Sequence, residues 1–287
     1  MIDLHIHTIY SSDGQYTPAE IVSLAGGRNV CTLAFCDHMD IRAASEGMDT
    51  AGMSGIELFS GVEISTSFRG REYHLLCYGF DPCCLRIRDF IDASCARIWK
   101  GVPAIIERFR KMGFRLDEKD IRGWGKSVPT GVSFLDALVK SNPDDPRLLL
   151  YTTGDRSDSP YLNFYQDFSR AGFGEALASN LPDLKRTVCS LKSCGVLVLA
   201  HPGDASRDLL RELKGYGLQG IEVYSSHHSP SVMRYLAESA ASLGLLRSAG
   251  SDFHGERIKP GVVLGSVPGL PDEALIETIR NAMPSRR

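Results

Sequence analysis

Residues 1–36 have the sequence MIDLHIHTIYSSDGQYTPAEIVSLAGGRNVCTLAFC, and this stretch determines the fold class. Met1–His7 is a short alternation of apolar and polar residues, which predicts a strand. Thr17–Glu20 combines a capping threonine, a first-turn proline and a capping-box glutamate, so it predicts the start of a helix. Gly26-Gly27 ends that helix, and Cys31–Cys36 is an apolar run typical of a buried strand. A strand, a helix and a second strand in succession predict an α/β fold.

The same alternation continues along the chain with one long interruption. Further strands are predicted over Ile56–Ser65, Tyr73–Phe80, Gly195–Ala200, Gly220–Tyr224 and Leu245–Ala249. Arg69-Gly70-Arg71 predicts a turn between the first two of these. Residues 81–186 instead have a helical pattern broken by glycine and proline. We therefore expect a body formed by residues 1–80 and 187–287, interrupted by a helical insertion at 81–186.

Composition excludes several classes of protein. The chain has 287 residues with 32 Lys plus Arg and 35 Asp plus Glu, a formal net charge of -3. This balance provides no broad basic face, so stable nucleic-acid binding is not expected. The chain contains no run of about 18 apolar residues that could cross a membrane. The N-terminus lacks the basic and apolar regions of a secretory signal, so we expect a cytoplasmic protein with reduced cysteines.

The histidines follow the predicted strands. Nearly all of the eight lie on or just after an apolar strand run, and none lies in the helical middle: His5, His7, His38, His74, His201, His227, His228 and His254. Barrels of parallel strands carry their functional groups at the carboxyl ends of the strands. Residues two apart in a strand face the same side, so His5 and His7 should point inward while Leu4 and Ile6 pack outward. For this pair alone, metal ligation and a buried structural role remain equally open.

Acidic residues accompany these histidines. Glu63 lies inside an apolar strand pattern, where a carboxylate is costly unless it is paired or coordinating. Asp252 and His254 repeat the spacing of His5 and His7, whereas Asp13 alone would be explained by an Asx turn. The complete set contains six histidines and three carboxylates: His5, His7, Asp13, His38, Glu63, His74, His201, Asp252 and His254. This is more than one zinc site needs, and it predicts two or three divalent ions with nitrogen and oxygen ligands, namely Mn, Fe or Zn.

The motifs that carry these residues resemble those of a known superfamily. They occur in the order His-Ile-His-Thr, Ser-Asp-Gly, Asp-His, Gly-Val-Glu-Ile, the His74 strand, Ala-His-Pro-Gly, Ile-Glu-Val-Tyr with a later His-Ser-Pro, and Gly-Ser-Asp-Phe-His-Gly. This set resembles the polymerase and histidinol phosphatase (PHP) superfamily over residues 1–80 and 195–260. It is most similar to the stand-alone phosphoesterases that act on nucleotides. The resemblance implies a distorted (β/α)7 TIM-like barrel with a helical insertion covering the active site.

The resemblance also implies a distribution of ligands over three ions. His5, His7, Glu63 and Asp252 would hold the first ion, and Glu63 would bridge to a second ion held by His74 and His201. Asp13, His38 and His254 would hold the third ion. Catalysis would then depend on Glu63, Asp252 and His228, with His228 contacting the substrate phosphate or protonating the leaving oxygen.

The function implied is metal-dependent hydrolysis of a small phosphate monoester, a nucleoside monophosphate or a 3',5'-bisphosphate, through attack of a metal-activated hydroxide on phosphorus. Three divalent ions minus the charges of Asp13, Glu63 and Asp252 leave a charge of +3 (6 − 3), which a monoester dianion and a hydroxide would match. A neutral amide would leave this charge unbalanced. The alternatives are a histidinol-phosphate phosphatase, a metal-dependent amidohydrolase and a non-catalytic PHP module.

The insertion departs from the pattern of the relatives. Where they tend to carry an arginine and a histidine, this chain has Gly131-Val132-Ser133, so either phosphate recognition differs or Lys126 binds the phosphate instead. One predicted helix face carries four aromatic residues: Tyr161, Phe164, Tyr165 and Phe168. This face would either stack on a base or pack on the barrel, and packing is favoured. Arg147, Arg156 and Arg170 would be phosphate clamps or, more simply, solvated surface.

Overall fold

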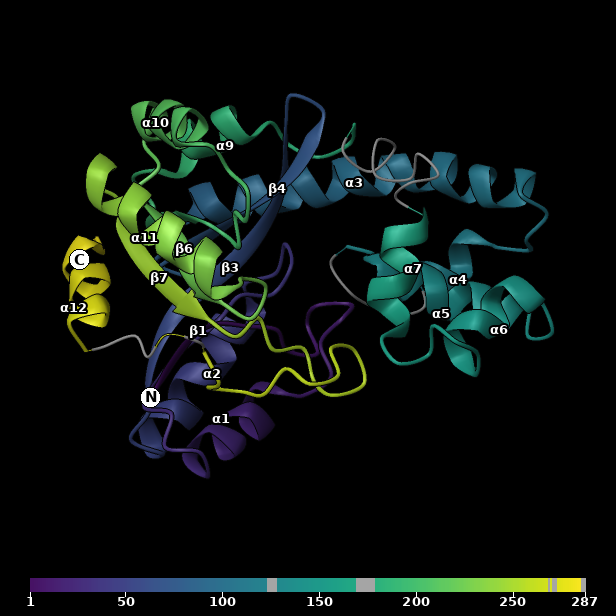
Figure 1. Ribbon diagram of the computed structural model, residues 1–287, viewed down its shortest axis with the longest axis horizontal. Helices are drawn as coiled ribbons and strands as arrows, with labels where there is room; N and C mark the ends of the chain where they lie inside the picture. Colours follow the sequence, from purple (N-terminus) through teal and green to yellow (C-terminus); the bar gives the residue numbers. More distant parts are fainter. Residues whose placement is uncertain (123–127, 169–178, 268, 270–272, 285–287) are drawn as a thin grey trace.

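The computed structural model describes residues 1–122, 128–168, 179–267, 269 and 273–284 (Figure 1). Seven strands form one sheet in sequence order: β1 (Ile2–Ile6), β2 (Thr32–Phe35), β3 (Glu57–Phe68), β4 (Arg71–Tyr78), β5 (Val196–Leu199), β6 (Gly220–Ser225) and β7 (Leu246–Gly250). β4 runs antiparallel to both of its neighbours, and the other pairs are parallel. The amide of His7 donates to the carbonyl of Phe253 at 2.9 Å, which nearly closes the sheet into a barrel. The predicted α/β barrel is confirmed.

The β3–β4 hairpin is longer than predicted. Arg69 and Gly70 have positive φ values of 52° and 76°, which make a tight turn. Strand pairing therefore continues up to Phe68 and Arg71, the residues on either side of the turn. The hairpin matters for the site because it carries Glu63 on one strand and His74 on the other.

Helices cover the outside of the barrel: α1 (Pro18–Gly26), α2 (Arg42–Met53), α9 (Leu184–Leu191), α10 (Arg207–Tyr216) and α11 (Pro230–Leu243). The capping box predicted for the first helix is present, because the Thr17 hydroxyl accepts the Glu20 amide at 3.2 Å. α12 (Glu273–Ala282) packs against the strand residues Leu76 and Val198. It closes the end of the barrel where the parallel strands begin, so the functional groups are left at the opposite end.

The inserted segment has a core of its own. It comprises the helices α3 (Leu85–Lys111), α4 (Glu118–Arg122), α5 (Gly131–Ser141), α6 (Pro146–Thr152) and α7 (Pro160–Phe168). The first half of α3 packs on the barrel through Ile87 and Ile98. The second half packs through Phe109 in a separate apolar cluster with residues of α5, α6 and α7. Figure 1 shows that α3 extends away from the barrel and that α4, α5, α6 and α7 lie near its far end. Among the described residues, no helix is long and apolar enough to span a membrane.

Candidate metal centre

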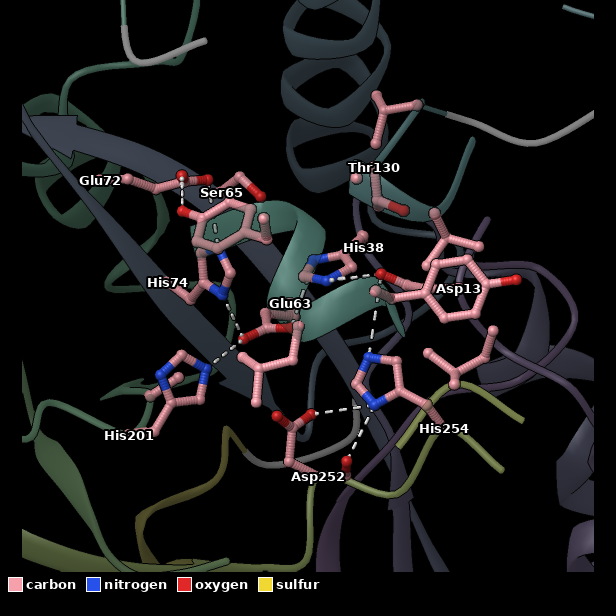
Figure 2. Close-up of a pocket in the computed structure, with 18 of the residues that line it drawn as sticks. Asp13, His38, Glu63, Ser65, Glu72, His74, Thr130, His201, Asp252 and His254 are labelled. Atoms are coloured by element: carbon pink, nitrogen blue, oxygen red, sulfur yellow. Dashed lines mark hydrogen bonds and ion pairs between the residues drawn. The ribbon is translucent and has the colours of Figure 1, made fainter. Parts of the chain in front are cut away.

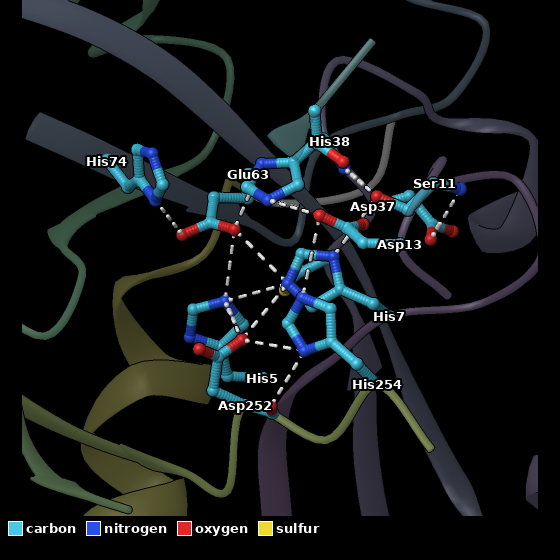
Figure 3. A network of polar contacts seen from close by, with 12 residues as sticks. His5, His7, Ser11, Asp13, Asp37, His38, Glu63, His74, Asp252 and His254 are labelled. Carbon is cyan, nitrogen blue, oxygen red and sulfur yellow. Dashed lines mark hydrogen bonds and ion pairs between the residues drawn. The ribbon is translucent and has the colours of Figure 1, made fainter. Parts of the chain in front are cut away.

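The structure brings all nine candidate ligands together at the mouth of the barrel (Figures 2 and 3). One group contains His5, His7, Glu63 and Asp252, and a second contains His7, Asp13, His38 and His254. A third contains His38, Glu63 and His74. Within each group, the potential ligand atoms lie within 4.8 Å of one another. His201 joins through its Nε2 atom, which lies 3.3 Å from Glu63 Oε1.

A bulge in β1 aims two histidines into this mouth. Asp3 pairs with Leu33 and Ile6 pairs with Phe35, so β1 contains one more residue than β2 over this interval. Leu4 therefore packs inside the barrel with the apolar residues of the other strands, and His5 points inward as well. The prediction that Leu4 faces outward was wrong, whereas Ile6 does pack outward against α1. Bulges of this kind re-aim side chains next to active sites.

Glu63 lies at the centre of the cluster. Its Oε2 atom is 3.3 Å from His5 Nε2, 3.1 Å from His7 Nε2 and 3.2 Å from His38 Nδ1. Its Oε1 atom faces a different set, 3.0 Å from His74 Nδ1 and 3.3 Å from His201 Nε2. Each oxygen of one carboxylate therefore faces its own group of imidazoles, which is the arrangement that a carboxylate bridging two cations requires.

The electrostatics of the mouth are those of a buried and highly charged cluster. Burial alone would raise the pKa of Glu63, but His74 and His5 outweigh it and hold that pKa well below its usual range. Burial also opposes charge on His7, yet Asp252 and Glu63 together raise the pKa of His7 to about 9. In contrast, burial lowers the pKa of His38 to about 4. Neighbouring imidazoles are therefore driven toward opposite protonation states.

The donor set fits divalent cations. Among the described residues, nine buried side-chain polar atoms make no hydrogen bond, and four of these lie at the mouth: Asp13 Oδ1, His38 Nδ1, His74 Nδ1 and Asp252 Oδ1. The last three lie at ion-pair distance from other candidate ligands. Buried polar atoms are normally paired, so unpaired atoms that converge on one region indicate missing partners. Imidazole nitrogens and carboxylate oxygens are ligands suited to Zn, Mn and Fe. The residues present could therefore hold two or three such ions.

Two carboxylates that the sequence reasoning did not assign accept hydrogen bonds from the candidate ligand histidines. Glu222 Oε1 accepts from His5 Nδ1 at 3.0 Å, and Oε2 accepts the amide of His201 at 2.8 Å. Glu72 accepts from His74 Nε2 at 3.2 Å. Such partners fix the orientation and basicity of ligand histidines. Like Glu63, Glu222 is an acidic residue within an apolar strand pattern, and this feature could have identified it from the sequence.

Two of the candidate ligands have strained backbones. His201 and Asp252 are non-glycine residues with positive φ values of 24° and 56°. Such conformations cost on the order of 1–3 kcal/mol and persist where the surroundings hold them. Glu222 accepts the amide of His201, and the buried carboxylate of Asp3 accepts both the amide and the hydroxyl of Ser251. Burial raises the pKa of Asp3 to about 6.

The structure does not bring His228 into the mouth with the other candidate residues. His228 Nδ1 donates to the carbonyl of Val223 at 2.9 Å, and Nε2 accepts the amide of Gly203 at 3.2 Å. Both ring nitrogens are thus engaged by the backbone. The neighbouring His227 lines the cavity instead, with Nε2 2.7 Å from Asp252 Oδ2. Lys126 lies outside the described residues.

A cavity of about 390 Å³ lies over the cluster (Figure 2). Its floor is formed by ligand residues such as Glu63 and Asp252, and its upper wall by Val132, Tyr161 and Tyr165 of the insertion. Its described lining also includes two residues with cationic side chains, Arg71 and Lys259. Lys259 is a site residue that sequence reasoning missed, because it lies in an irregular segment without periodicity.

The aromatic face of α7 is divided between two environments. Phe164 and Phe168 are buried in the core of the insertion, whereas Tyr161 and Tyr165 line the cavity. The expectation that this face packs on the barrel is therefore wrong for Phe164 and Phe168, whereas Tyr165 does reach the barrel by donating to Glu72 of β4. Arg147 is paired with Asp145 and Arg156 with Asp167, both within the insertion, and Arg170 lies outside the described residues.

Comparisons with known proteins agree with this geometry. A family model described as PHP domain matches residues 3–94. A 3',5'-nucleoside bisphosphate phosphatase of Chromobacterium violaceum is 30% identical over 259 residues, which cover 88% of this chain and 87% of that protein. A 5'-3' exoribonuclease of Haemophilus influenzae is 28% identical over 261 residues, covering 88% of this chain and 89% of that protein. The crystal structure of a Bifidobacterium adolescentis protein classed as a metal-dependent phosphoesterase has the same fold, with a TM-score of 0.76, 24% identity and coverage of 98% of this chain and 96% of that one.

Proposed function

Because this chain belongs to the PHP-domain family and is a hydrolase of phosphoric esters, we propose that it removes phosphate from a small monoester, a nucleoside monophosphate or a 3',5'-bisphosphate. The cofactors would be two or three divalent ions of Mn, Fe or Zn. The main support for the proposal is the position of Glu63, because its two carboxylate oxygens face separate groups of imidazoles. Phosphoesterases use such pairs of cations to bind both the attacking and the leaving oxygen.

Two of the ions would share Glu63, and the other ligands would each belong to one ion. His5, His7, Glu63 and Asp252 would hold one ion, Glu63, His74 and His201 a second, and Asp13, His38 and His254 a third. Bound divalent cations supply a nucleophile by lowering the pKa of water, and they neutralise charge on the phosphoryl oxygens.

The protein would contribute orientation and exclusion of water. Glu222 and Glu72 hold the second nitrogens of His5 and His74, so these rings cannot rotate away from the cluster. Residues 81–186 would form the cover of the active site, with Val132 and Tyr165 lining the cavity. His228 would have a structural role, because it ties the loop after His201 to β6 through Gly203 and Val223.

The cavity favours a nucleotide over a smaller substrate. Its volume of about 390 Å³ lies within the range of about 300–1,000 Å³ found for small-molecule sites. The wall opposite the ligand residues carries Tyr161 and Tyr165, whose rings offer apolar contact area for a base. The related phosphatase of C. violaceum, named for 3',5'-nucleoside bisphosphates, supports the same substrate class.

An exoribonuclease is the second candidate, favoured by the name of the H. influenzae relative. Both activities would use the same metal centre but differ in the length of the bound chain. The near-neutral composition, with a net charge of -3, favours a short substrate.

The test combines elemental analysis with phosphate release. The purified protein, loaded with Mn, Fe or Zn in turn, is assayed on mononucleotides, 3',5'-bisphosphates, histidinol phosphate and a 5'-phosphorylated oligoribonucleotide. We expect metal in the protein and phosphate release from a nucleotide. Phosphate release from histidinol phosphate alone, shortening of the oligoribonucleotide without phosphate release, or no reaction would each overturn the proposal.

Glu63→Gln provides the matching variant. We expect it to lose bound metal and to reduce turnover by about 10⁴-fold, because the bridging charge is removed. The control is Asp117→Asn in the insertion, which removes an exposed carboxylate paired with Arg110. Exposed pairs contribute about 0–1 kcal/mol, so this variant should retain both metal and turnover.

A further inference from the structure

Lys259 places a fixed positive charge beside the candidate metal centre. It lies in a turn in which its own amide donates to the carbonyl of Gly255 at 3.0 Å, next to the buried Ile258. The side chain lines the cavity and is 25% exposed. Its ammonium pairs with Asp252 Oδ2 and lies 3.1 Å from His227 Nε2. The anchored turn therefore directs this side chain into the cavity instead of outward into solvent.

Asp252 divides its two oxygens between different partners. Oδ1 faces the cluster, 3.3 Å from His5 Nε2 and 3.1 Å from His7 Nε2. Oδ2 faces the cavity wall, where it contacts His227 and Lys259. Lys259 therefore does not occupy the position between the ligand atoms of His5, His7 and Glu63. Its ion pair with Asp252 is compatible with a metal held through Oδ1.

The charge at this position lacks a full counter-charge. Among the described residues, Asp252 is the carboxylate with which Lys259 forms an ion pair. The same carboxylate is shared with the imidazoles of His5 and His7. With divalent cations bound, Asp252 would be further committed to them. A partly buried ammonium beside cations is unfavourable unless an anion lies nearby.

We propose that Lys259 binds a non-bridging oxygen of the phosphate being hydrolysed, with His227 as a positioning residue that holds Asp252 Oδ2 beside it. This inference rests on the proposed function, since it names the group that contacts the reacting phosphate. A lysine binds phosphate as a compact point charge with three donors. Lys259 acts neither as a general acid nor as a general base in the reaction. Its positive charge offsets the negative charge on the phosphoryl oxygens.

The test compares Lys259→Met and Lys259→Arg with Lys140→Met. Lys140 is an exposed lysine of α5 that pairs with Asp120, so it controls for loss of a lysine as such. Three quantities are measured: metal content by elemental analysis, affinity of the metal-loaded protein for inorganic phosphate by calorimetry, and kcat/KM on the best nucleotide. We expect Lys259→Met to retain metal, to bind phosphate at least tenfold more weakly and to lose about 10²-fold in kcat/KM. Lys259→Arg should retain part of the phosphate affinity, and Lys140→Met should match the unaltered protein.

The outcomes separate this inference from the proposed function. Phosphate affinity within twofold of the unaltered protein in metal-loaded Lys259→Met would refute phosphate binding by Lys259. Loss of metal in that variant would refute it too, since Lys259 would then only hold Asp252 in place. If the unaltered protein releases no phosphate from any ester, the proposed function fails. The calorimetric comparison of phosphate binding still decides the role of Lys259 in that case.

Discussion

The barrel mouth and the insertion bury side chains of opposite chemistry. At the mouth, imidazoles and carboxylates such as His5, His7 and Glu63 are almost completely buried and depend on one another for charge balance. In the insertion, Phe109 lies at the centre of a group of aromatic rings, with its centroid 6.0 Å from that of Phe134 and 5.4 Å from that of Phe168. The mouth should therefore respond to metal and pH, and the insertion to changes in packing volume.

Besides the apolar packing of α3 on the barrel, polar contacts between described residues connect the insertion with the mouth. Ser12, next to the candidate ligand Asp13, donates its hydroxyl to Thr130 at the start of α5 at 2.8 Å. Tyr165 of α7 donates to Glu72 at 3.2 Å. The insertion therefore contacts segments that carry ligand residues, although its apolar core is separate. Three perturbations of decreasing size test how independent the two regions are.

The largest effect is expected from Phe109→Ala. Removal of a fully buried phenylalanine costs about 3–5 kcal/mol through lost transfer energy and a cavity. Because Phe109 belongs to the core of the insertion, we expect hydrogen exchange to accelerate in α5 and α7 while the barrel retains its metal. The matched variant is Leu76→Ala in the barrel interior, which should lower the stability of the barrel by about 2–5 kcal/mol.

Hydrogen exchange and elemental analysis of both variants check this separation. If Phe109→Ala lost metal to the same extent as Leu76→Ala, the two cores would form a single cooperative unit. The continuous α3 helix is the element that could couple them, since its first half packs on the barrel and its second half in the insertion.

The next effect concerns pH and is confined to the mouth. In the metal-free protein, Asp252 and Glu63 outweigh burial and raise the pKa of His7 to about 9. The charged imidazolium stabilises the metal-free fold below about pH 6.5, and this contribution is lost as the pH rises through 9. Metals bind the neutral ring, so each unit of pH below 9 costs about tenfold in affinity for one displaced proton.

Counting the His7 proton alone, we therefore expect metal affinity to increase about 50-fold between pH 7 and 9, equivalent to about 2.3 kcal/mol, because half of the rings still carry the proton at pH 9. Over the same interval, the stability of the metal-free protein should decrease. Competition with a chromophoric chelator and urea unfolding measure the two quantities. An affinity that does not change with pH would show that His7 is neutral before metal binds.

The fold and the convergence of the candidate ligands at one mouth could be predicted from local signals along the chain. Apolar runs end at histidines, and Glu63 interrupts an apolar strand, so these residues indicate a site together although Asp13 alone would not. The bulge in β1 has no such signal, and the inward position of Leu4 emerged only from its pairing with β2. Periodicity also cannot choose between His227 and His228, because they lie in a turn after β6. The role of Glu222 depends on β6 bringing it beside His5, which no local pattern shows.

The smallest effect is expected from Tyr165→Phe, which removes a hydroxyl that connects the two regions. That hydroxyl donates to Glu72, which in turn accepts from the candidate ligand His74. Hydrogen bonds to charged groups are worth about 1.5–3 kcal/mol when buried, and the partial exposure of Tyr165 reduces this value. We expect a three- to tenfold decrease in kcat/KM with unchanged metal content.

Tyr151→Phe is the control because its hydroxyl donates to Asp167 within the insertion at 2.7 Å. It deletes the same atom in the same helical region without touching the connection to the mouth. Equal kcat/KM values for the two variants would mean that the insertion covers the site without influencing His74. A decrease confined to Tyr165→Phe would mean that closure of the insertion and orientation of a metal ligand are coupled through Glu72.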